Sequence, residues 1–242
     1  MRIIYQKSSN LNTYDFFYAG QTKSYISAVN FNITYTKDKK IVVFNNASSD
    51  VAITNAINSS TLGSLQGYEI VPLDILLEQL NRNNFKKGIY INLVPSNPGI
   101  LTNENIQEVT INMHNYVDEL NRIINKYPSL DINLHSINQS LATILKQKVT
   151  HRKIGMVVSG ADLTYLEVNY YIILSNVLND AIIDGLLRKN KEVNIFVYSD
   201  YYISYLYQHY LGEKTTPYLQ QVLPKLGIIS SYPEIIDKVF NQ

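Results

Sequence analysis

The chain of 242 residues contains no cysteine, which excludes disulfide bonds, thiolate metal sites and cysteine nucleophiles. It has only four histidines and a net charge of +1, and its lysines and arginines form no basic tract. No whole-molecule field therefore favours nucleic acid or a strongly anionic membrane. No stretch approaches the roughly 18 apolar residues of a membrane span, and the apolar run near residue 1 is too short for a signal peptide. We expect a cytoplasmic protein that neither binds nucleic acid nor spans a membrane.

The sequence does contain short β-branched runs that alternate with longer amphipathic segments, a pattern typical of parallel strands joined by helices. Eight runs are expected to be strands: residues 2–5, 27–35, 89–94, 131–135, 153–159, 170–174, 193–198 and 227–230. Between several of these strands lie segments with apolar residues at three- and four-residue spacing, as in amphipathic helices. The clearest are residues 73–81, 103–126, 139–148, 176–189 and 203–210. Thr102 or Asn103 is a plausible cap for the longest helix.

Residues 40–44 follow the second strand after only a tight turn. Because a parallel crossover needs a dozen or more residues, this run is expected to be a hairpin arm outside the ring of strands. Eight strands then remain, and a (β/α)8 barrel of this type needs about 250 residues. Periodicity alone leaves a doubly wound open sheet as the competing arrangement. No linker or repeat divides the chain, so residues 1–242 are expected to form one domain.

Several stretches, taken in order, resemble the signature of bacterial glycerophosphodiester phosphodiesterases. The first strand ends Gln6-Lys7-Ser8 where that family has His-Arg-Gly, and residues 29–39 stand for its Glu-x-Asp strand and Thr-Lys-Asp-Gly turn. Residues 42–46, Val-Val-Phe-Asn-Asn, resemble its Val-Val-Phe-His-Asp arm, and residues 65–73 resemble its Leu-Gly-Tyr and Pro-Leu entry to a helix. Residues 91–94, Ile-Asn-Leu-Val, stand where the family has Ile-Glu-Ile-Lys.

The second half resembles the family in scaffold residues. Residues 135–138 are similar to its Ser-Ser-Phe-Asp, residues 153–158 to its Lys-Ile-Gly-Leu-Leu strand, and residues 193–200 to its Val-x-Val-Trp-Thr-Val-Asn strand. Residues 227–233, Gly-Ile-Ile-Ser-Ser-Tyr-Pro, are similar to its terminal Gly-Ile-Ile-Thr-Asp-Tyr-Pro. The resemblance spans nearly the whole chain and implies an α/β barrel of the TIM type, with a hairpin arm after the second strand.

The resemblance also implies a divalent cation held by three carboxylates, two histidines that act as nucleophile or acid and base, and an arginine that binds phosphate. In this chain the histidine positions are Gln6 and Asn45, and the arginine position is Lys7. The three carboxylate positions are Asn30, Asn32 and Asn92, and Val94 replaces a lysine.

These replacements remove the chemistry that the family mechanism requires. Three asparagines supply no negative charge to a hard cation, and neither Gln6 nor Asn45 exchanges a proton near neutral pH. We therefore expect no catalytic residue, no metal site and no cofactor. Asparagine is abundant here, with 27 copies, and codons for Asp, His and Asn lie one base apart. Drift after loss of function thus stands beside retained polar binding as an explanation of the amides.

Other residues at the carboxyl ends of the strands are candidates for replacement chemistry, although each also has a structural explanation. They are Lys7, His135, Ser136, Ser159, Asp162, Ser175, Tyr198, Asp200 and Ser231. A single histidine beside a strand end is more often structural, and the two aspartates more often cap or close a loop. His114, His151 and His209 lie at no ligand spacing. The tyrosine-rich residues 201–210 fit an interface or, more simply, a helix packed on the barrel.

Two functions of different classes follow from these observations. In the first, the chain is a noncatalytic, pseudoenzyme member of the family, in which Gln6, Lys7, Asn30, Asn32, Asn45 and Asn92 bind a polar ligand such as a sugar, a polyol or a phosphate-bearing group, or a protein partner that acts in lipid or polysaccharide metabolism. In the second, it is a phosphoric diester hydrolase with residual activity or a rearranged site. A third possibility is a barrel kept only as an interaction surface.

Overall fold

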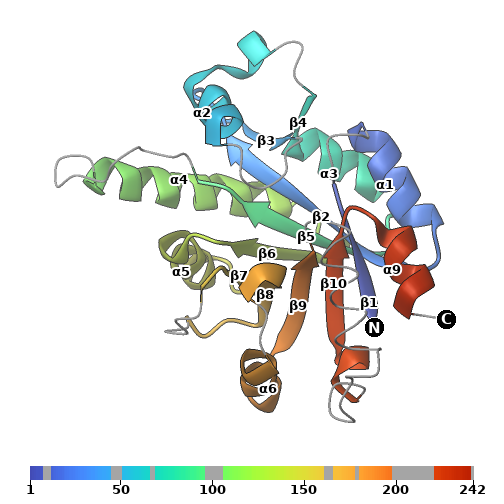
Figure 1. Cartoon of the computed structure of the whole chain (residues 1–242). Coiled ribbons are helices and arrows are strands. Elements are labelled where there is room, and N and C mark those ends of the chain that lie inside the picture. Colours follow the sequence, from blue (N-terminus) through green and yellow to red (C-terminus); the bar gives the residue numbers. More distant parts are fainter. Residues whose placement is uncertain are drawn as a thin grey trace.

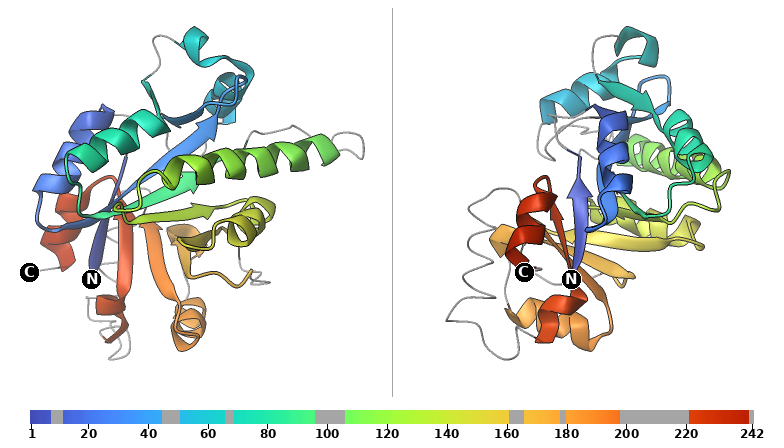
Figure 2. Two further views of the ribbon diagram at one scale, coloured as in Figure 1. Left: turned by 180° about the vertical axis from the view of Figure 1, so that it is seen from behind. Right: turned by 90° about the vertical axis from the view of Figure 1, so that its right-hand side faces the viewer.

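The fold was analysed in a computed structural model, which describes residues 1–7, 12–44, 51–65, 69–95, 106–160, 166–177, 180–197 and 221–240. Eight parallel strands form a closed ring in the order β1, β2, β5, β6, β7, β8, β9 and β10. Pairing of β10 with β1, from Arg2 opposite Gly227 to Tyr5 opposite Ser230, closes the ring. The strands follow one another around the axis in Figures 1 and 2. This is a (β/α)8 barrel of the TIM type, and the open doubly wound sheet is excluded.

The ring strands are those expected from the sequence. Their bounds are β1 (Arg2–Gln6), β2 (Ile26–Tyr35), β5 (Gly88–Leu93), β6 (Ile132–Ser136), β7 (Lys153–Val158), β8 (Tyr170–Leu174), β9 (Glu192–Val197) and β10 (Leu226–Ser230). Each bound lies within one residue of its prediction. Short β-branched runs are well recognised in sequence because strands buried on both faces need apolar residues at nearly every position.

A hairpin arm leaves the ring after β2, as predicted. β3 (Ile41–Phe44) pairs antiparallel with β2, and β4 (Ile70–Pro72), which the sequence did not reveal, pairs antiparallel with β3. The turn is fastened by Thr36, whose carbonyl accepts from the Lys39 amide and whose hydroxyl accepts from the Lys40 amide. α2 (Val51–Ser59) and the short helix η1 (Leu62–Leu65) belong to the same arm, at the top of Figure 1.

Helices cover the outside of the ring. Three match the sequence prediction closely: α3 (Leu73–Arg82), α4 (Ile106–Ile124) and α5 (Gln139–Lys148). The segment predicted at 176–189 is divided between the short helix η2 (Ser175–Val177) and α6 (Asp180–Arg188). The sequence did not reveal α1 (Thr13–Thr22), α9 (Pro233–Phe240) or η3 (Leu223–Lys225). The predicted helix 203–210 and the predicted cap at Thr102 or Asn103 lie outside the described residues.

Local signals explain why α1 and α5 begin where they do. The side chains of Asn12 and Asn138 accept from the backbone amides of Asp15 and Leu141, each at 2.9 Å. Such caps satisfy amides that the first turn leaves unpaired, and each stabilises its helix by about 1 kcal/mol. None of the helices in the described part of the chain is both long and apolar enough to cross a membrane.

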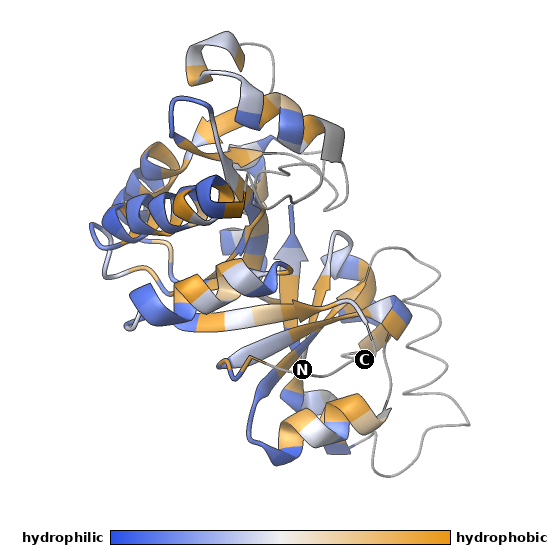
Figure 3. Ribbon diagram, turned by 90° about the vertical axis from the view of Figure 1, so that its left-hand side faces the viewer, coloured by the Kyte–Doolittle hydropathy of each residue, from blue (hydrophilic) through white to orange (hydrophobic). Residues whose placement is uncertain are grey.

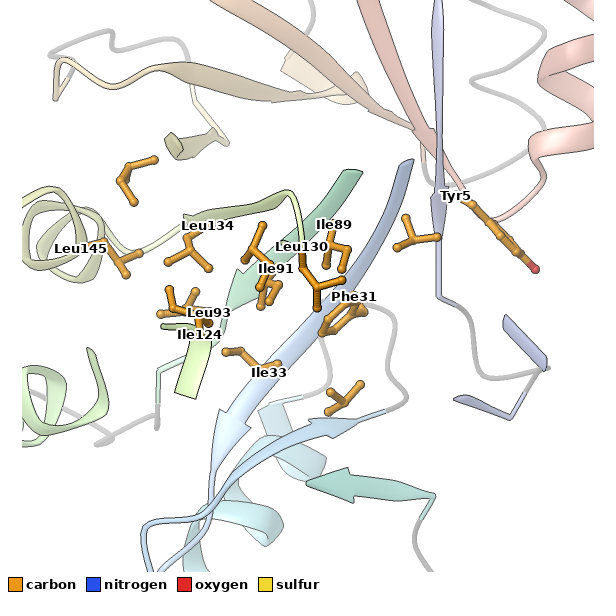
Figure 4. Packing of buried hydrophobic residues seen from close by; sticks show 14 of the residues in the cluster. Tyr5, Phe31, Ile33, Ile89, Ile91, Leu93, Ile124, Leu130, Leu134 and Leu145 are labelled. Carbon is orange, nitrogen blue, oxygen red and sulfur yellow. The ribbon is translucent and has the colours of Figure 1, made fainter. Parts of the chain in front are cut away.

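Strand alternation divides the buried side chains into two layers. Residues facing outward, among them Phe31, Ile33, Ile91 and Leu93, pack against the helices, and Figure 4 shows them beside Ile124 of α4. Figure 3 shows the strands as mostly hydrophobic. A separate inner cluster fills the barrel and consists of Ile4, Ala28, Tyr90, Val157, Tyr170, Ile172 and Ile229. Full burial of each such side chain stabilises the fold by about 1.5–3 kcal/mol.

Two glycines make room for large inward-facing side chains. A β-carbon added at Gly155 would overlap the ring of Tyr170 on the next strand. One added at Gly227 would overlap the side-chain oxygen of Asn194. Gly155 therefore allows Tyr170, which has no exposed surface, to occupy the centre of the barrel.

The amino-terminal end of the barrel is closed by charged side chains. Glu192 lies 2.6 Å from Arg2 and 3.4 Å from Lys153, and it accepts hydrogen bonds from the Tyr90 hydroxyl at 2.6 Å and the Asn194 amide at 3.3 Å. Arg2 also donates to the Asn194 side-chain oxygen at 3.2 Å. We expect this network to serve stability, since the functional loops of a TIM barrel lie at the opposite end.

Candidate functional site

Four of the six predicted site residues lie together on the inner face of three neighbouring strands. Gln6 ends β1 and is in register with Asn30 of β2, while Asn32 of β2 is in register with Asn92 of β5. Gln6, Asn30 and Asn32 are almost completely buried, with 5%, 2% and 3% of their surface exposed. All four stand towards the carboxyl ends of the strands, where TIM barrels carry their functional groups. The alignment inferred from the resemblance thus brings together residues up to 86 positions apart, from Gln6 to Asn92.

Hydrogen bonding fixes the orientation of the first two amides. Gln6 Nε2 donates to the Lys7 carbonyl at 3.0 Å, and since a carbonyl only accepts, Gln6 must turn its Oε1 the other way. Asn30 Nδ2 then donates to Gln6 Oε1 at 2.6 Å. The remaining polar atom of Asn30, Oδ1, is buried and has no hydrogen-bond partner among the described residues.

The second pair repeats this arrangement. Asn92 Nδ2 donates to Asn32 Oδ1 at 2.9 Å, and Asn92 Oδ1 is again buried without a partner in the described part of the chain. Leaving a buried acceptor unpaired costs about 1–3 kcal/mol. The inner face of the mouth therefore presents two carbonyl oxygens that a hydrogen-bond donor would satisfy.

Lys7 does not join the amides through its side chain. Its Nζ lies 3.8 Å from Glu69 Oε1, just before β4, and 6.0 Å from the ring centroid of Phe16 on α1. Because Gln6 faces into the barrel, its neighbour Lys7 points to the helix side. Burial lowers the pKa of Lys7 to about 8, against the opposing effect of Glu69.

Among the described residues, Glu69 is a neighbour of the predicted Lys7 that sequence reasoning missed. It belongs to no motif, and it contacts Lys7 from the segment just before β4. The one available signal was a carboxylate directly ahead of a β-branched pair, Ile70 and Val71, and that signal is too common to be specific.

His135 occupies the inner face of β6, in register with Asn92. It is 1% exposed, and its Nδ1 lies 3.1 Å from the Tyr170 hydroxyl. Burial lowers the pKa of His135 to about 3, so the ring is neutral at physiological pH and a weak base. This favours the structural interpretation of His135. Of the other histidines, His114 lies on α4, His151 lies in an exposed turn, and His209 is outside the described residues.

The remaining mouth candidates divide between structural roles and undescribed positions. Ser136 faces the helix side, where its hydroxyl donates to the Leu93 carbonyl and accepts from the Asn138 amide, which favours a structural role for this residue. Ser175 is buried, Ser159 is exposed and Ser231 is half-buried. Five predicted features lie outside the described residues: Asn45, Asp162, Tyr198, Asp200 and the tyrosine-rich segment 201–210.

Val94 has an apolar role where the resemblance implies a lysine. Its amide donates to the Ile33 carbonyl at 2.9 Å, and its side chain packs on a small cluster of the arm. The buried members of this cluster are Val42, Phe44, Ile57 and Leu65. A charged side chain at this position would have to be desolvated against that surface, which explains why valine suits this chain.

The donor set of the mouth does not fit a magnesium or calcium ion. Such ions are held mainly by anionic oxygens, and Asn30, Asn32 and Asn92 offer only amide groups. Among the described residues, no three histidine, aspartate, glutamate or cysteine side chains gather as a metal would require. The described arrangement is suited to accepting hydrogen bonds from a ligand rather than to polarising one.

A surface groove of about 450 Å³ lies between α1 and α3, away from the mouth. It has an apolar floor that includes Phe17, Leu76 and Leu80, and Tyr14 and Tyr18 stand at its rim with 48% and 73% of their surface exposed. This groove is the surface to which the interaction hypothesis applies.

Comparison with known proteins finds likeness in structure. No family model matches the sequence, and no curated protein matches it. The fold is similar to that of an Oleispira antarctica phosphodiesterase solved with its product sn-glycerol-3-phosphate, with a TM-score of 0.71, 15% identity, and 100% of this chain and 97% of that chain covered.

Two further solved structures have the same fold. A glycerophosphodiester phosphodiesterase from Parabacteroides distasonis has a TM-score of 0.68 and 12% identity, covering 99% of this chain and 96% of that one. One from Agrobacterium tumefaciens has a TM-score of 0.62 and 11% identity, covering 99% of this chain and 100% of that one. At these identities the likeness establishes the fold, and the fold implied by the resemblance is confirmed.

Proposed function

We propose that this chain is a member of the glycerophosphodiester phosphodiesterase family that has lost metal-dependent hydrolysis and binds a small polar ligand at its mouth. The observation that carries the proposal is the inward-facing amide set, in which Asn30 and Asn92 each keep one buried carbonyl oxygen that has no partner among the described residues. These amides occupy positions where the resemblance implies carboxylates and a histidine. A surface left by simple decay has no reason to keep unpaired acceptors in a buried position, since each one destabilises the fold.

Loss of hydrolysis follows from the groups that remain. Phosphodiester cleavage needs proton transfer, and neither Gln6 nor the asparagines titrate near neutral pH. His135 is neutral, with its pKa lowered to about 3 by burial, and its Nδ1 faces the Tyr170 hydroxyl. It therefore supplies no general acid at physiological pH.

The kind of ligand is supported by the structural neighbour from Oleispira antarctica, which holds sn-glycerol-3-phosphate. A small polyhydroxylated molecule of that size matches the donor requirement of the amide oxygens. In the proposed role the chain senses or carries such a molecule without converting it.

A second candidate function, a rearranged phosphodiesterase, is favoured by the pair of Lys7 and Glu69. Burial lowers the pKa of Lys7 to about 8, so this lysine, 3.8 Å from the Glu69 carboxylate, can release a proton near neutral pH. One assay distinguishes the two candidate functions.

The assay measures release of a phosphomonoester from a panel of glycerophosphodiesters in the presence of Mg²⁺, Ca²⁺ or Mn²⁺. We expect no turnover by the natural protein. A variant that carries Gln6→His, Asn30→Glu, Asn32→Asp, Asn45→His and Asn92→Glu restores the groups that the resemblance implies. Metal-dependent turnover by this variant would support the residue assignments.

Metal-dependent turnover by the natural protein would overturn the proposal. The variant Glu69→Gln then identifies the source of the activity. If that activity falls at least tenfold in Glu69→Gln, the pair of Lys7 and Glu69 performs the proton transfer. Arg82→Gln, in an exposed ion pair on α3, serves as a charge-removal control.

A further inference from the structure

The two unpaired oxygens of the mouth lie on one face of two neighbouring strands. Asn30 is in register with Tyr90, so Asn92 stands two residues further along the adjacent strand. With strands about 4.8 Å apart and a rise of about 3.3 Å per residue, the two Cα atoms are about 8 Å apart. One small molecule with several hydroxyl groups can span that separation.

The chemistry of these atoms restricts what they bind. An amide oxygen only accepts hydrogen bonds, so Asn30 Oδ1 and Asn92 Oδ1 both require a donor. A hydroxyl group supplies one. A phosphate near neutral pH presents mainly acceptor oxygens, which would face the two carbonyl oxygens and be repelled by them.

Described cations of the barrel are directed elsewhere. The Lys7 ammonium faces Glu69 and the Phe16 ring on the helix side of β1. Arg2 lies at the opposite end of the barrel, bound to Glu192 at 2.6 Å. A dianion placed beside the amides would lose its hydration without gaining a compensating charge from these two side chains.

We infer that the mouth binds an uncharged polyol or sugar, through hydroxyl groups that donate to Asn30 and Asn92, and discriminates against the phosphorylated form of the same molecule. This inference rests on the proposed function, because it specifies the ligand of the same site. It also separates this chain from its structural neighbour, whose product is phosphorylated.

The test compares matched pairs of ligands by isothermal titration calorimetry on the full chain. The pairs are glycerol and sn-glycerol 3-phosphate, sorbitol and sorbitol 6-phosphate, and myo-inositol and myo-inositol 1-phosphate. At least one neutral member is expected to bind at least tenfold more tightly than its phosphorylated partner. Its affinity is expected to stay within about twofold when the salt concentration rises tenfold, because no ion pair is formed.

Two variants test the named atoms. Asn92→Leu removes the acceptor at similar volume and is expected to weaken binding of the neutral ligand at least tenfold. Asn133→Leu is the matched control, since Asn133 is also buried and inward-facing but stands at the start of β6, towards the other end of the barrel. Its affinity is expected to equal that of the natural protein, with folding of both variants checked by thermal unfolding.

Each outcome has a separate meaning. If a phosphorylated member binds more tightly than its neutral partner, the inference is wrong while the proposed ligand-binding function stands. If no member of any pair binds, the inference is also wrong and water satisfies the two oxygens. Hydrolysis of glycerophosphodiesters by the natural protein would instead overturn the proposed function itself, and that assay is independent of the binding measurements.

Discussion

The two ends of this barrel use buried polar groups in opposite ways. At the amino-terminal end, Glu192 receives contacts from Arg2, Lys153, Tyr90 and Asn194, so its oxygens are well satisfied. At the carboxyl-terminal end, the amides of Gln6, Asn30, Asn32 and Asn92 pair with one another and, within the part of the chain that the structure describes, leave two oxygens unsatisfied.

This difference indicates which end stabilises the fold and which end is available to a ligand. A satisfied ionic network cannot bind a further molecule without breaking its own contacts. A set of neutral amides with spare acceptors gains stability when a donor arrives. Substitutions at the first end should therefore change stability, and those at the second should change binding.

The largest effect is expected from Glu192→Gln. Loss of the carboxylate leaves Arg2 without its ion pair. Because Arg2 is 36% exposed, the expected loss in free energy of unfolding is about 2 kcal/mol, less than for a fully buried pair. Urea unfolding at pH 7 measures this loss. Glu167→Gln, in an ion pair whose glutamate is 80% exposed, is the control and should change stability by less than about 0.5 kcal/mol.

The stability difference between the natural protein and Glu192→Gln is expected to depend on pH. Burial acts to raise the pKa of Glu192, but the Tyr90 hydrogen bond and Arg2 outweigh it, and the pKa is lowered overall. A carboxyl whose pKa is lower in the folded state stabilises the protein above its unfolded pKa, about 4.3, and loses that effect as pH falls through the folded value. The difference between the natural protein and Glu192→Gln should therefore shrink below about pH 4. A difference that is independent of pH would contradict the ionic interpretation.

The second-largest effect on stability is expected in the layer of packed side chains inside the barrel, between its two ends. Gly155→Ala is expected to destabilise the fold by about 1–2 kcal/mol, because its methyl group would displace the ring of Tyr170. Thermal unfolding measures the change. Gly185→Ala on α6 is the matched control: its methyl group meets open space, and the better helix propensity of alanine should raise stability by up to about 1 kcal/mol. Equal effects of the two substitutions would contradict the role given to Gly155.

A smaller effect on the free energy of unfolding is expected from the titration of Lys7. Since burial lowers its pKa to about 8, the unfolded chain binds the proton more tightly than the folded one between pH 8 and the ordinary lysine value. Stability should therefore rise with pH from about 8 to 9.5, by about 1 kcal/mol, and Lys7→Met should abolish the rise. Unfolding at fixed temperature across this range measures it. Lys126→Met, in a half-exposed pair with Asp74, should keep the rise.

The smallest effect on stability is expected where the effect on binding is greatest. Replacing both members of the first amide pair, Gln6→Leu with Asn30→Leu, should change the free energy of unfolding by less than about 1 kcal/mol, because donor, acceptor and unpaired oxygen disappear together. Ligand binding should be lost. Denaturant unfolding and calorimetry on the same preparation measure both. A loss of several kcal/mol would show that the mouth, like the other end, serves stability.

Strand positions were predictable because the signal is local. A ring strand such as Tyr170–Leu174 is apolar or aromatic throughout, and burial on both faces favours this. Two of the helices that escaped prediction, α1 and α2, have weaker local signals. α1 is rich in tyrosine and phenylalanine, α2 in β-branched residues and asparagine, and both hold their form through packing rather than propensity.

Prediction of the candidate site was also uneven. The resemblance to the phosphodiesterase family identified Gln6, Asn30, Asn32 and Asn92, and these residues do lie together on the inner face of β1, β2 and β5. It grouped Lys7 with them, but strand alternation turns that side chain towards α1 and Glu69. Position at the end of a strand placed Ser136 among the candidates for replacement chemistry, although its hydroxyl donates to the Leu93 carbonyl.

By itself the sequence determined the eight ring strands, the hairpin arm and the amide residue types at positions 6, 30, 32 and 92, because each depends on residue type and local order. Tertiary structure alone decided the pairing of β10 with β1, the contact between Lys7 and Glu69, the low pKa of His135 and the two unpaired oxygens. The physical reason is that burial and hydrogen-bond satisfaction depend on which distant segments surround a group. Whether an asparagine oxygen is left without a donor is settled only when every neighbouring strand is in place.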